Sequence, residues 1–262
     1  MTTEILYILS GFVVGIIVGM TGVGGGSLMT PLLVLGFGIK PAIAVGTDLL
    51  YAAITKSGGI FVHHAKGNIQ WDILILLSLG SVPASLVSLF VLSRLENAGV
   101  NYDDIIMTTL SFALILTAVF LFTRNFIQKY VVSAEMESLK ALHKRFTKPA
   151  TIVSGILIGA LVTISSVGAG VIGAAVLFIL YPRMKTIQIA ATDLAHAVPI
   201  TAIAGLGHAH IGTVNYLLLV TLLIGSLPGV YVGSHIGSFL PEKIMRPFLA
   251  TMLLAIGVKL VL

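Results

Sequence analysis

Residues 40–49, KPAIAVGTDL, return 145 positions later as residues 185–194, KTIQIAATDL. The same spacing, without a gap, matches further residues that shared hydrophobicity does not place in register: His63 with His208, Gly67 with Gly212, and Pro83 with Pro228. We therefore interpret the chain as an internal duplication. Two membrane repeats, residues 1–123 and 150–262, flank a basic connector at residues 124–149.

The composition places both repeats in a membrane. Of the 262 residues, 57% are hydrophobic and only 10% are charged, whereas soluble domains average about 25% charged residues. The apolar stretches are long enough for crossing helices, which need about 20 apolar residues. The first residues lack the basic region and the cleavage site of a signal peptide. We expect an all-α, multi-pass protein of the plasma membrane (the inner membrane of a bacterium), with the lipid bilayer around it.

Each repeat opens with an apolar stretch that glycines interrupt. Residues 5–37 contain TGVGGGS at 21–27, and the counterpart in the second repeat contains SSVGAG at 165–170. Glycine runs destabilise helices, and a broken helix in a membrane must be buried in protein or line a wet cavity. We expect each stretch to form a broken or re-entrant hairpin of two helices of about 16 residues. Three transmembrane helices then follow in each repeat.

The distribution of Lys and Arg indicates how the repeats are oriented. The connector carries six of these residues and should be cytoplasmic, because cytoplasmic loops are enriched in positive charge. If each opening stretch returns to its own side, the repeats are inverted, with eleven Lys and Arg inside and three outside. If each stretch crosses once, the repeats are parallel and the numbers are eight and six. We choose the inverted arrangement, and we expect the connector to be a short amphipathic helix with Ser133 as its N-cap.

The glycine-rich interruptions are the predicted binding site. Inverted repeats with broken helices recur in secondary transporters, whose substrate lies between the repeats. Free N–H groups at the start of a helix attract anions, and glycine lets the backbone approach them closely. The alternative is close helix packing, for which membrane proteins also use small residues. The substrate-binding candidates are Thr21, Gly22, Gly24, Gly25, Gly26, Ser27, Ser165, Ser166, Gly168 and Gly170.

Asp48 and Asp193 occupy equivalent positions in two apolar segments, where a carboxylate is costly and usually functional. Two roles remain open for them. They could cap a local restart of a helix, or they could take up protons and couple proton movement to substrate movement. A carboxylate that faces an anionic substrate repels it unless it is protonated, which fits the second role.

Lys56 and two histidines are further candidates. Lys56 has no basic equivalent, because Thr201 occupies the matching position. Its side chain either reaches the membrane interface, or it pairs with Asp48 or with a substrate anion, so Lys56 is also a substrate-binding candidate. His63 and His208 lie where segments leave the membrane and are candidates for proton coupling.

We expect neither a metal site nor the active site of an enzyme. His208 and His210 are two residues apart and do not share a helix face, and no Cys or nearby carboxylate completes a ligand shell. The sequence contains no catalytic constellation and no nucleotide-binding motif. We therefore expect no catalytic residue, no cofactor and no nucleic-acid partner.

The glycine-rich opening stretch and the two Thr-Asp segments resemble the motifs of a known family. The stretch FVVGIIVGMTGVGGG at 12–26, followed by PLL at 31–33, is similar to the opening motif of the TauE/SafE sulfite exporter family. The tetrapeptides GTDL at 46–49 and ATDL at 191–194 also resemble this family, although the proline after the second tip, Pro182, is displaced. The resemblance covers nearly the whole chain. It implies an inner-membrane transporter of anions, often sulfur oxyanions or small organosulfonates, driven by the proton gradient.

The leading hypothesis is a secondary transporter of a small anion such as sulfite, an organosulfonate or a related sulfur oxyanion, with its site at the repeat interface. One rival is a divalent-metal or cation permease that uses the intramembrane Asp and His residues. Another is an intramembrane enzyme that acts on a lipid phosphate, which needs a nucleophile or metal shell that the sequence lacks. The direction of transport and the oligomeric state stay open, with a homodimer allowed.

Overall fold

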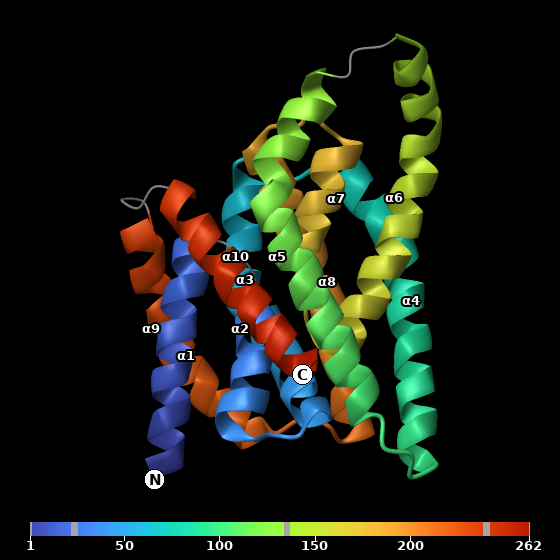
Figure 1. The fold of residues 1–262 in the computed structure, drawn as a ribbon. Coiled ribbons are helices and arrows are strands. Elements are labelled where there is room, and N and C mark those ends of the chain that lie inside the picture. The colour runs from blue at the N-terminus through green and yellow to red at the C-terminus, as the bar shows by residue number, and fades with distance from the viewer. Residues whose placement is uncertain (1, 22–25, 134–136, 238–241, 262) are drawn as a thin grey trace.

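The computed structural model describes residues 2–21, 26–133, 137–237 and 242–261, and it leaves out the side chains of residues 2, 21, 26, 59, 61–63, 124–133, 137–145, 237, 242–246 and 261 within these ranges. Every regular element in the described part of the chain is helical (Figure 1). The elements, of which η1 is a short π-helix, are α1 (Thr2–Thr21), α2 (Gly26–Pro31), η1 (Leu32–Gly36), α3 (Pro41–Ala65), α4 (Trp71–Asn97), α5 (Asp103–Ser133), α6 (Glu137–Ser165), α7 (Ile172–Leu180), α8 (Thr186–Ile211), α9 (Tyr216–Gly237) and α10 (Glu242–Val261).

Helices α3 and α8 pack against each other at the centre of the bundle (Figure 1). On one side α1 lies along α9, on the other side α6 lies along α4, and α5 lies along α10. At the same spacing of 145 residues, α1 corresponds to α6, α3 to α8, α4 to α9 and α5 to α10. Each contact therefore has an equivalent in which the two halves exchange roles, and both halves contribute to each side of the bundle.

The two central helices begin directly after the duplicated lysines of the sequence. Pro41 occupies the first turn of α3, where its missing N–H has no helical partner to lose. At the start of α8, the backbone N–H of Lys185 donates to the side chain of Gln188 at 3.2 Å, which satisfies one of the free amides of the first turn. Local sequence thus sets where each central helix begins, and the positions of Asp48 and Asp193 follow from this.

Six helices in the described part of the chain are long and apolar enough to cross a membrane: α1, α4, α5, α6, α8 and α9. The predicted all-helical, multi-pass architecture is confirmed at this level. In each half, a long helix precedes a shorter helical segment, and three long helices follow. The expectation of two hairpin helices of equal length was wrong, because α1 has 20 residues and α2 only 6, while α6 has 29 and α7 only 9.

The connector differs from its prediction. Ser133 is the last residue of α5 rather than the N-cap of a separate helix, and residues 137–149 belong to α6. The basic segment is therefore built largely from extensions of two bundle helices. These extensions lie at the upper end in Figure 1, opposite the N-terminus of the chain.

Glycine allows the tightest helix contacts, and the duplicated pair Gly80 and Gly225 shows how. A Cβ atom on Gly80 would overlap the carbonyl oxygen of Ile152 on α6, and one on Gly225 would overlap that of Ile8 on α1. Because backbone lies directly against each glycine, a side chain here cannot be accommodated by a rotamer change. Close backbone approach through small residues is how membrane helices gain packing contacts.

We expect Gly80→Ala to lower the thermal stability of the purified protein clearly, by about 1–3 kcal/mol of overpacking. The matched control is Gly58→Ala, because a Cβ at this exposed helical glycine meets no atom within 4 Å. Helix propensity favours Ala over Gly, so the control should be unchanged or slightly more stable. Melting curves in detergent measure both variants, and equal melting temperatures would contradict the packing argument.

Candidate functional site

Asp48 is completely buried and joins both halves of the chain. The hydroxyl of Thr30 on α2 donates to its Oδ2 at 2.5 Å, and the hydroxyl of Ser166, which follows α6, donates to the same oxygen at 3.0 Å. Oδ1 accepts no hydrogen bond from the described residues. Helix α2 and the segment after α6, which are far apart in sequence, thus meet on one carboxylate.

Lys56 lies two turns after Asp48 on α3 and is also buried, with 7% of its surface exposed. Its ammonium group donates to the backbone carbonyl of Ala169 at 2.9 Å. It interacts electrostatically with the carboxylates of Asp193 and Asp48, most strongly with Asp193. The interpretation that Lys56 reaches the membrane interface was therefore wrong, because its charge points into the second tip.

Asp193 lies on α8, is 3% exposed, and faces the same tip from the other side. Its Oδ1 packs directly against Gly173 on α7, so closely that a Cβ atom at Gly173 would overlap it. The backbone amide of Gly170 interacts with the same carboxylate. Asp193 thus sits at the start of α7, where free amides favour negative charge.

Helices α3 and α8 run without interruption through Asp48 and Asp193. The interpretation that these residues cap a local helix restart was therefore wrong. They act between elements, since their described partners come from α2, from the segment after α6, and from Lys56.

The second tip, residues 166–171, is unwound and buried between α6 and α7. Three of its residues have positive φ: Ser166 at 60°, Gly168 at 118° and Gly170 at 129°. The hydroxyl of Ser165 donates to the carbonyl of Leu161 in its own helix at 2.7 Å. Ser166, Gly168 and Gly170 therefore lie in the predicted tip, whereas Ser165 closes the end of α6.

Most of the first tip lies outside the description. The structure of Gly22, Gly24 and Gly25 is not described, and for Thr21 and Gly26 only the helical backbone is described. Ser27, the last candidate of this tip, is 5% exposed at the start of α2. Thr30 was missed by the sequence reasoning, although a hydroxyl one turn beyond a predicted tip is a signal that could have found it.

Two threonines that precede the aspartates make reciprocal hydrogen bonds between the halves. The backbone N–H of Asn215 donates to Thr47 Oγ1 at 3.0 Å, and the backbone N–H of Gln70 donates to Thr192 Oγ1 at 3.0 Å. Gln70 and Asn215 are also equivalent in the duplication, being 145 positions apart. Each half therefore holds the other through the same pair of contacts.

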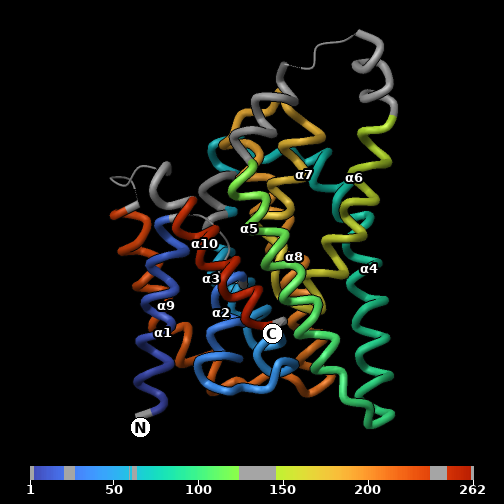
Figure 2. Tube along the Cα trace, viewed as in Figure 1, coloured from blue at the N-terminus to red at the C-terminus, as the bar shows by residue number. Residues whose placement is uncertain are grey.

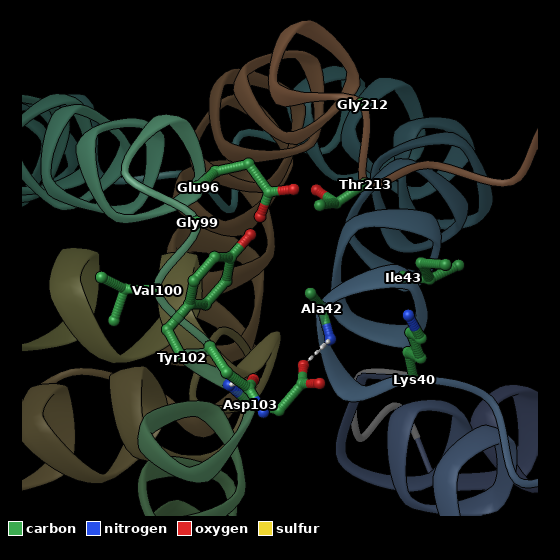
Figure 3. Close-up of a pocket in the computed structure, with 11 residues that line it drawn as sticks. Lys40, Ala42, Ile43, Glu96, Gly99, Val100, Tyr102, Asp103, Gly212 and Thr213 are labelled. Atoms are coloured by element: carbon green, nitrogen blue, oxygen red, sulfur yellow. Dashed lines mark hydrogen bonds between the residues drawn. The ribbon is translucent and has the colours of Figure 1, made fainter.

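A pocket of about 460 Å³ opens where α3 begins, α8 ends and the loop between α4 and α5 turns (Figure 3). Its lining includes Lys40, Glu96 and Asp103, and Asp103 accepts the N–H of Ala42 at 3.3 Å. The hydroxyl of Tyr102 points toward Glu96 in Figure 3. Burial, together with this neighbouring carboxylate, raises the pKa of Tyr102 above its usual range, so the hydroxyl keeps its proton at neutral pH.

His208 connects this pocket to the interior. Its Nδ1 lies 2.8 Å from the hydroxyl of Thr213, which lines the pocket, and its Nε2 donates to the carbonyl of Thr163 at 3.0 Å. His208 is completely buried rather than interfacial. The side chain of His63, its duplicated counterpart, lies outside the description. Buried His196 on α8 binds Ser81 on α4 at 2.8 Å.

No group of three or more His, Asp or Glu side chains that could hold a metal occurs among the described residues. The polar centre is instead one ammonium and two carboxylates, surrounded by hydroxyl and backbone groups. Such a set can bind an anion through Lys56 and small cations through the carboxylates.

Known proteins are similar in sequence to this chain along nearly its whole length. Residues 7–260 match the family described as sulfite exporter TauE/SafE. The chain belongs to this family. It is 35% identical over 254 residues to the probable membrane transporter protein YjnA of Bacillus subtilis strain 168, an alignment that covers 97% of this chain and 98% of the relative.

Two further relatives match this chain with lower identity. The probable membrane transporter protein YdhB of Bacillus subtilis strain 168 is 27% identical over 92% of this chain and 93% of its own length. The probable membrane transporter protein MJ0441 of Methanocaldococcus jannaschii is 28% identical over 96% of this chain and 91% of its own length. No solved structure matches this TauE/SafE family chain.

Proposed function

We propose that this protein is a secondary transporter of sulfite, an organosulfonate or a related sulfur oxyanion, and that the proton gradient drives it. The observation that carries the proposal is the buried ammonium of Lys56, which interacts with two carboxylates, one from each half of the chain. The family description, sulfite exporter, supports the substrate class. The names of the relatives support transport rather than catalysis.

The charges of this centre favour coupling to a cation. With both aspartates ionised, Lys56 leaves one negative charge uncompensated, so an anion that approaches Lys56 is repelled. Two unit charges 4 Å apart interact by about 4 kcal/mol at the effective dielectric constant of a protein site. Neutralising one carboxylate with a proton removes a repulsion of this size. The anion and the proton therefore bind better together than apart, which is the requirement for coupled transport.

We further propose that the two halves are inverted repeats that give alternating access to this centre. The reciprocal hydrogen bonds of Thr47 and Thr192, and the exchanged helix contacts, are the pattern expected of a two-fold relation. The trace in Figure 2 supports inversion, since α1 runs upward from the N-terminus whereas α6 runs downward from the upper end. Transporters with such repeats carry the substrate site near the membrane midplane.

The pocket supports an entry route on one face. It lies at the opposite end of the bundle from the basic connector, and the positive-inside rule would make that face the outer one in a bacterial inner membrane. Lys40 at its rim offers a first attraction for an anion. Thr213 lines the pocket, and two residues later the backbone N–H of Asn215 donates to Thr47, the neighbour of Asp48.

The function is tested with purified protein in liposomes that hold a pH gradient. We expect uptake of radiolabelled sulfite, or of a small sulfonate, that stops when a protonophore collapses the gradient. The same anions should raise the melting temperature in detergent, because a ligand that binds the folded state stabilises it. Sulfate and chloride serve as comparison anions. Absence of both transport and stabilisation across the panel, together with a stabilising effect of a divalent metal, would favour the metal-permease rival.

A further inference from the structure

Asp48 and Asp193 are equivalent in the duplication, yet their surroundings differ in charge. Asp193 interacts most strongly with a positive side chain, the ammonium of Lys56. Asp48 is held by two neutral hydroxyls, from Thr30 and Ser166, and Oδ1 of each aspartate has no hydrogen-bond partner among the described residues. The direct contacts of Asp48 thus come from hydroxyl oxygens, whereas the stronger electrostatic interaction of Lys56 is with Asp193.

The duplication explains why. Lys56 belongs to the first half, but its ammonium donates to the carbonyl of Ala169 in the second tip. The same ammonium interacts electrostatically with Asp193. The residue that would serve the first tip in the same way is Thr201 on α8. Thr201 is completely buried, and its hydroxyl donates to the carbonyl of Ala197 in its own helix at 2.8 Å. The attached cation therefore has no counterpart at the equivalent position near Asp48.

We infer that Asp48 is an exchangeable site for one small monovalent cation, and that the Lys56 ammonium is the permanently attached cation of the equivalent site at Asp193. Carboxylate and hydroxyl oxygens are ligands for hard cations, and the single negative charge of Asp48 matches one proton or one alkali-metal ion such as Na⁺. Unwound tip segments commonly complete such sites in transporters. This inference deepens the proposed function, because it assigns the coupling cation to one of the two aspartates.

The charged groups around Asp48 agree with this assignment. Lys56 interacts electrostatically with both carboxylates, more strongly with Asp193 than with Asp48. The neighbours that contact the carboxylate of Asp48, Thr30 and Ser166, are uncharged. One ammonium group cannot neutralise two carboxylates, so we assign Lys56 to Asp193 and a free cation to Asp48.

The test exchanges the two duplicated positions. We expect Thr201→Lys to supply Asp48 with an attached cation and to abolish the dependence of the melting temperature on exchangeable cations. Lys56→Thr should do the reverse and create a second exchangeable site. Binding of ²²Na⁺ at pH 8 should then fall to background in Thr201→Lys and double in Lys56→Thr, relative to one ion in the original protein. Thr201→Met separates the effect of charge from that of bulk.

Two series of melting-temperature measurements distinguish Na⁺ from the proton as the bound cation. Stabilisation by Na⁺ at constant pH, measured against choline, assigns the alkali-metal ion, whereas a dependence on pH alone in choline buffer assigns the proton. In the proton arm, the count of protons taken up on acidification replaces the count of ²²Na⁺. Either result supports an exchangeable cation at Asp48 if Asp48→Asn removes the dependence and Asp193→Asn retains it.

Milder variants keep the test decisive where an introduced lysine prevents folding. Thr30→Val and Ser166→Ala should each weaken cation binding about tenfold, in proportion to one lost oxygen contact. The inference is overturned if these variants and Asp48→Asn leave the cation dependence intact, or if Asp193→Asn alone removes it. Melting curves with sulfite in the same samples show separately whether anion binding, and hence the proposed function, holds.

Discussion

Replacing Lys56 with Met should lower anion transport about 100-fold or more while leaving the protein embedded in the membrane. Met preserves the length and the apolar stem but removes the charge that interacts with Asp193 and Asp48. The loss of about 3 kcal/mol of attraction for the transported anion corresponds to about two orders of magnitude in rate. Transport in liposomes measures the effect, and Lys66→Met, at an exposed position just beyond α3, is the matched control.

This variant should also be less stable, and the two effects can be separated. Removing one partner of a buried ion pair typically costs about 3–5 kcal/mol, because the other charge remains without compensation. Adding Asp193→Asn to Lys56→Met removes that remaining charge and should restore most of the melting temperature. It should not restore transport. Recovery of transport in the double variant would show that Lys56 supports the fold only and does not attract the substrate.

The residues of this centre could be predicted from the sequence to a useful extent. The duplication pointed to Asp48, Asp193 and the two tips, because a carboxylate repeated in two apolar segments is a costly feature that packing alone does not explain. Ser166 and Lys56 were named as candidates, and both contact the centre. Repetition was thus the informative signal, since it identifies polar positions without any knowledge of which helices meet.

What could not be predicted depends on the register between helices. Lys56 lies in a segment whose sequence permits an interfacial or an inward side chain, and only its contact with Ala169 decides between them. The pattern Thr-Asp is typical of helix caps as well as of buried sites, which is why the capping role stayed open. Thr30 and Gly173 were not named, because the importance of each comes from an aspartate on another helix.

Gly173 gives the second prediction with a large effect, because this glycine sets where Asp193 sits. A methyl group at Gly173 would overlap Asp193 Oδ1, so Gly173→Ala must displace this carboxylate, which interacts with Lys56, from its place at the start of α7. We expect a loss of about 1–3 kcal/mol of stability from the overlap, together with strongly reduced transport. Both follow from one contact, and a double-mutant cycle can test this.

The cycle compares Gly173→Ala, Asp193→Ala and the double variant by melting temperature and by the free energy of unfolding. Asp193→Ala alone should destabilise the protein, since it leaves Lys56 without its main partner. It also removes the atom that the new methyl group would meet, so the double variant should be no less stable than Asp193→Ala. The coupling energy should then lie at about 1–3 kcal/mol, within the range observed for residues in contact. Additive losses would instead mean that Gly173 is needed for the backbone of the tip itself, and the contact with Asp193 would not be what restricts this position to glycine.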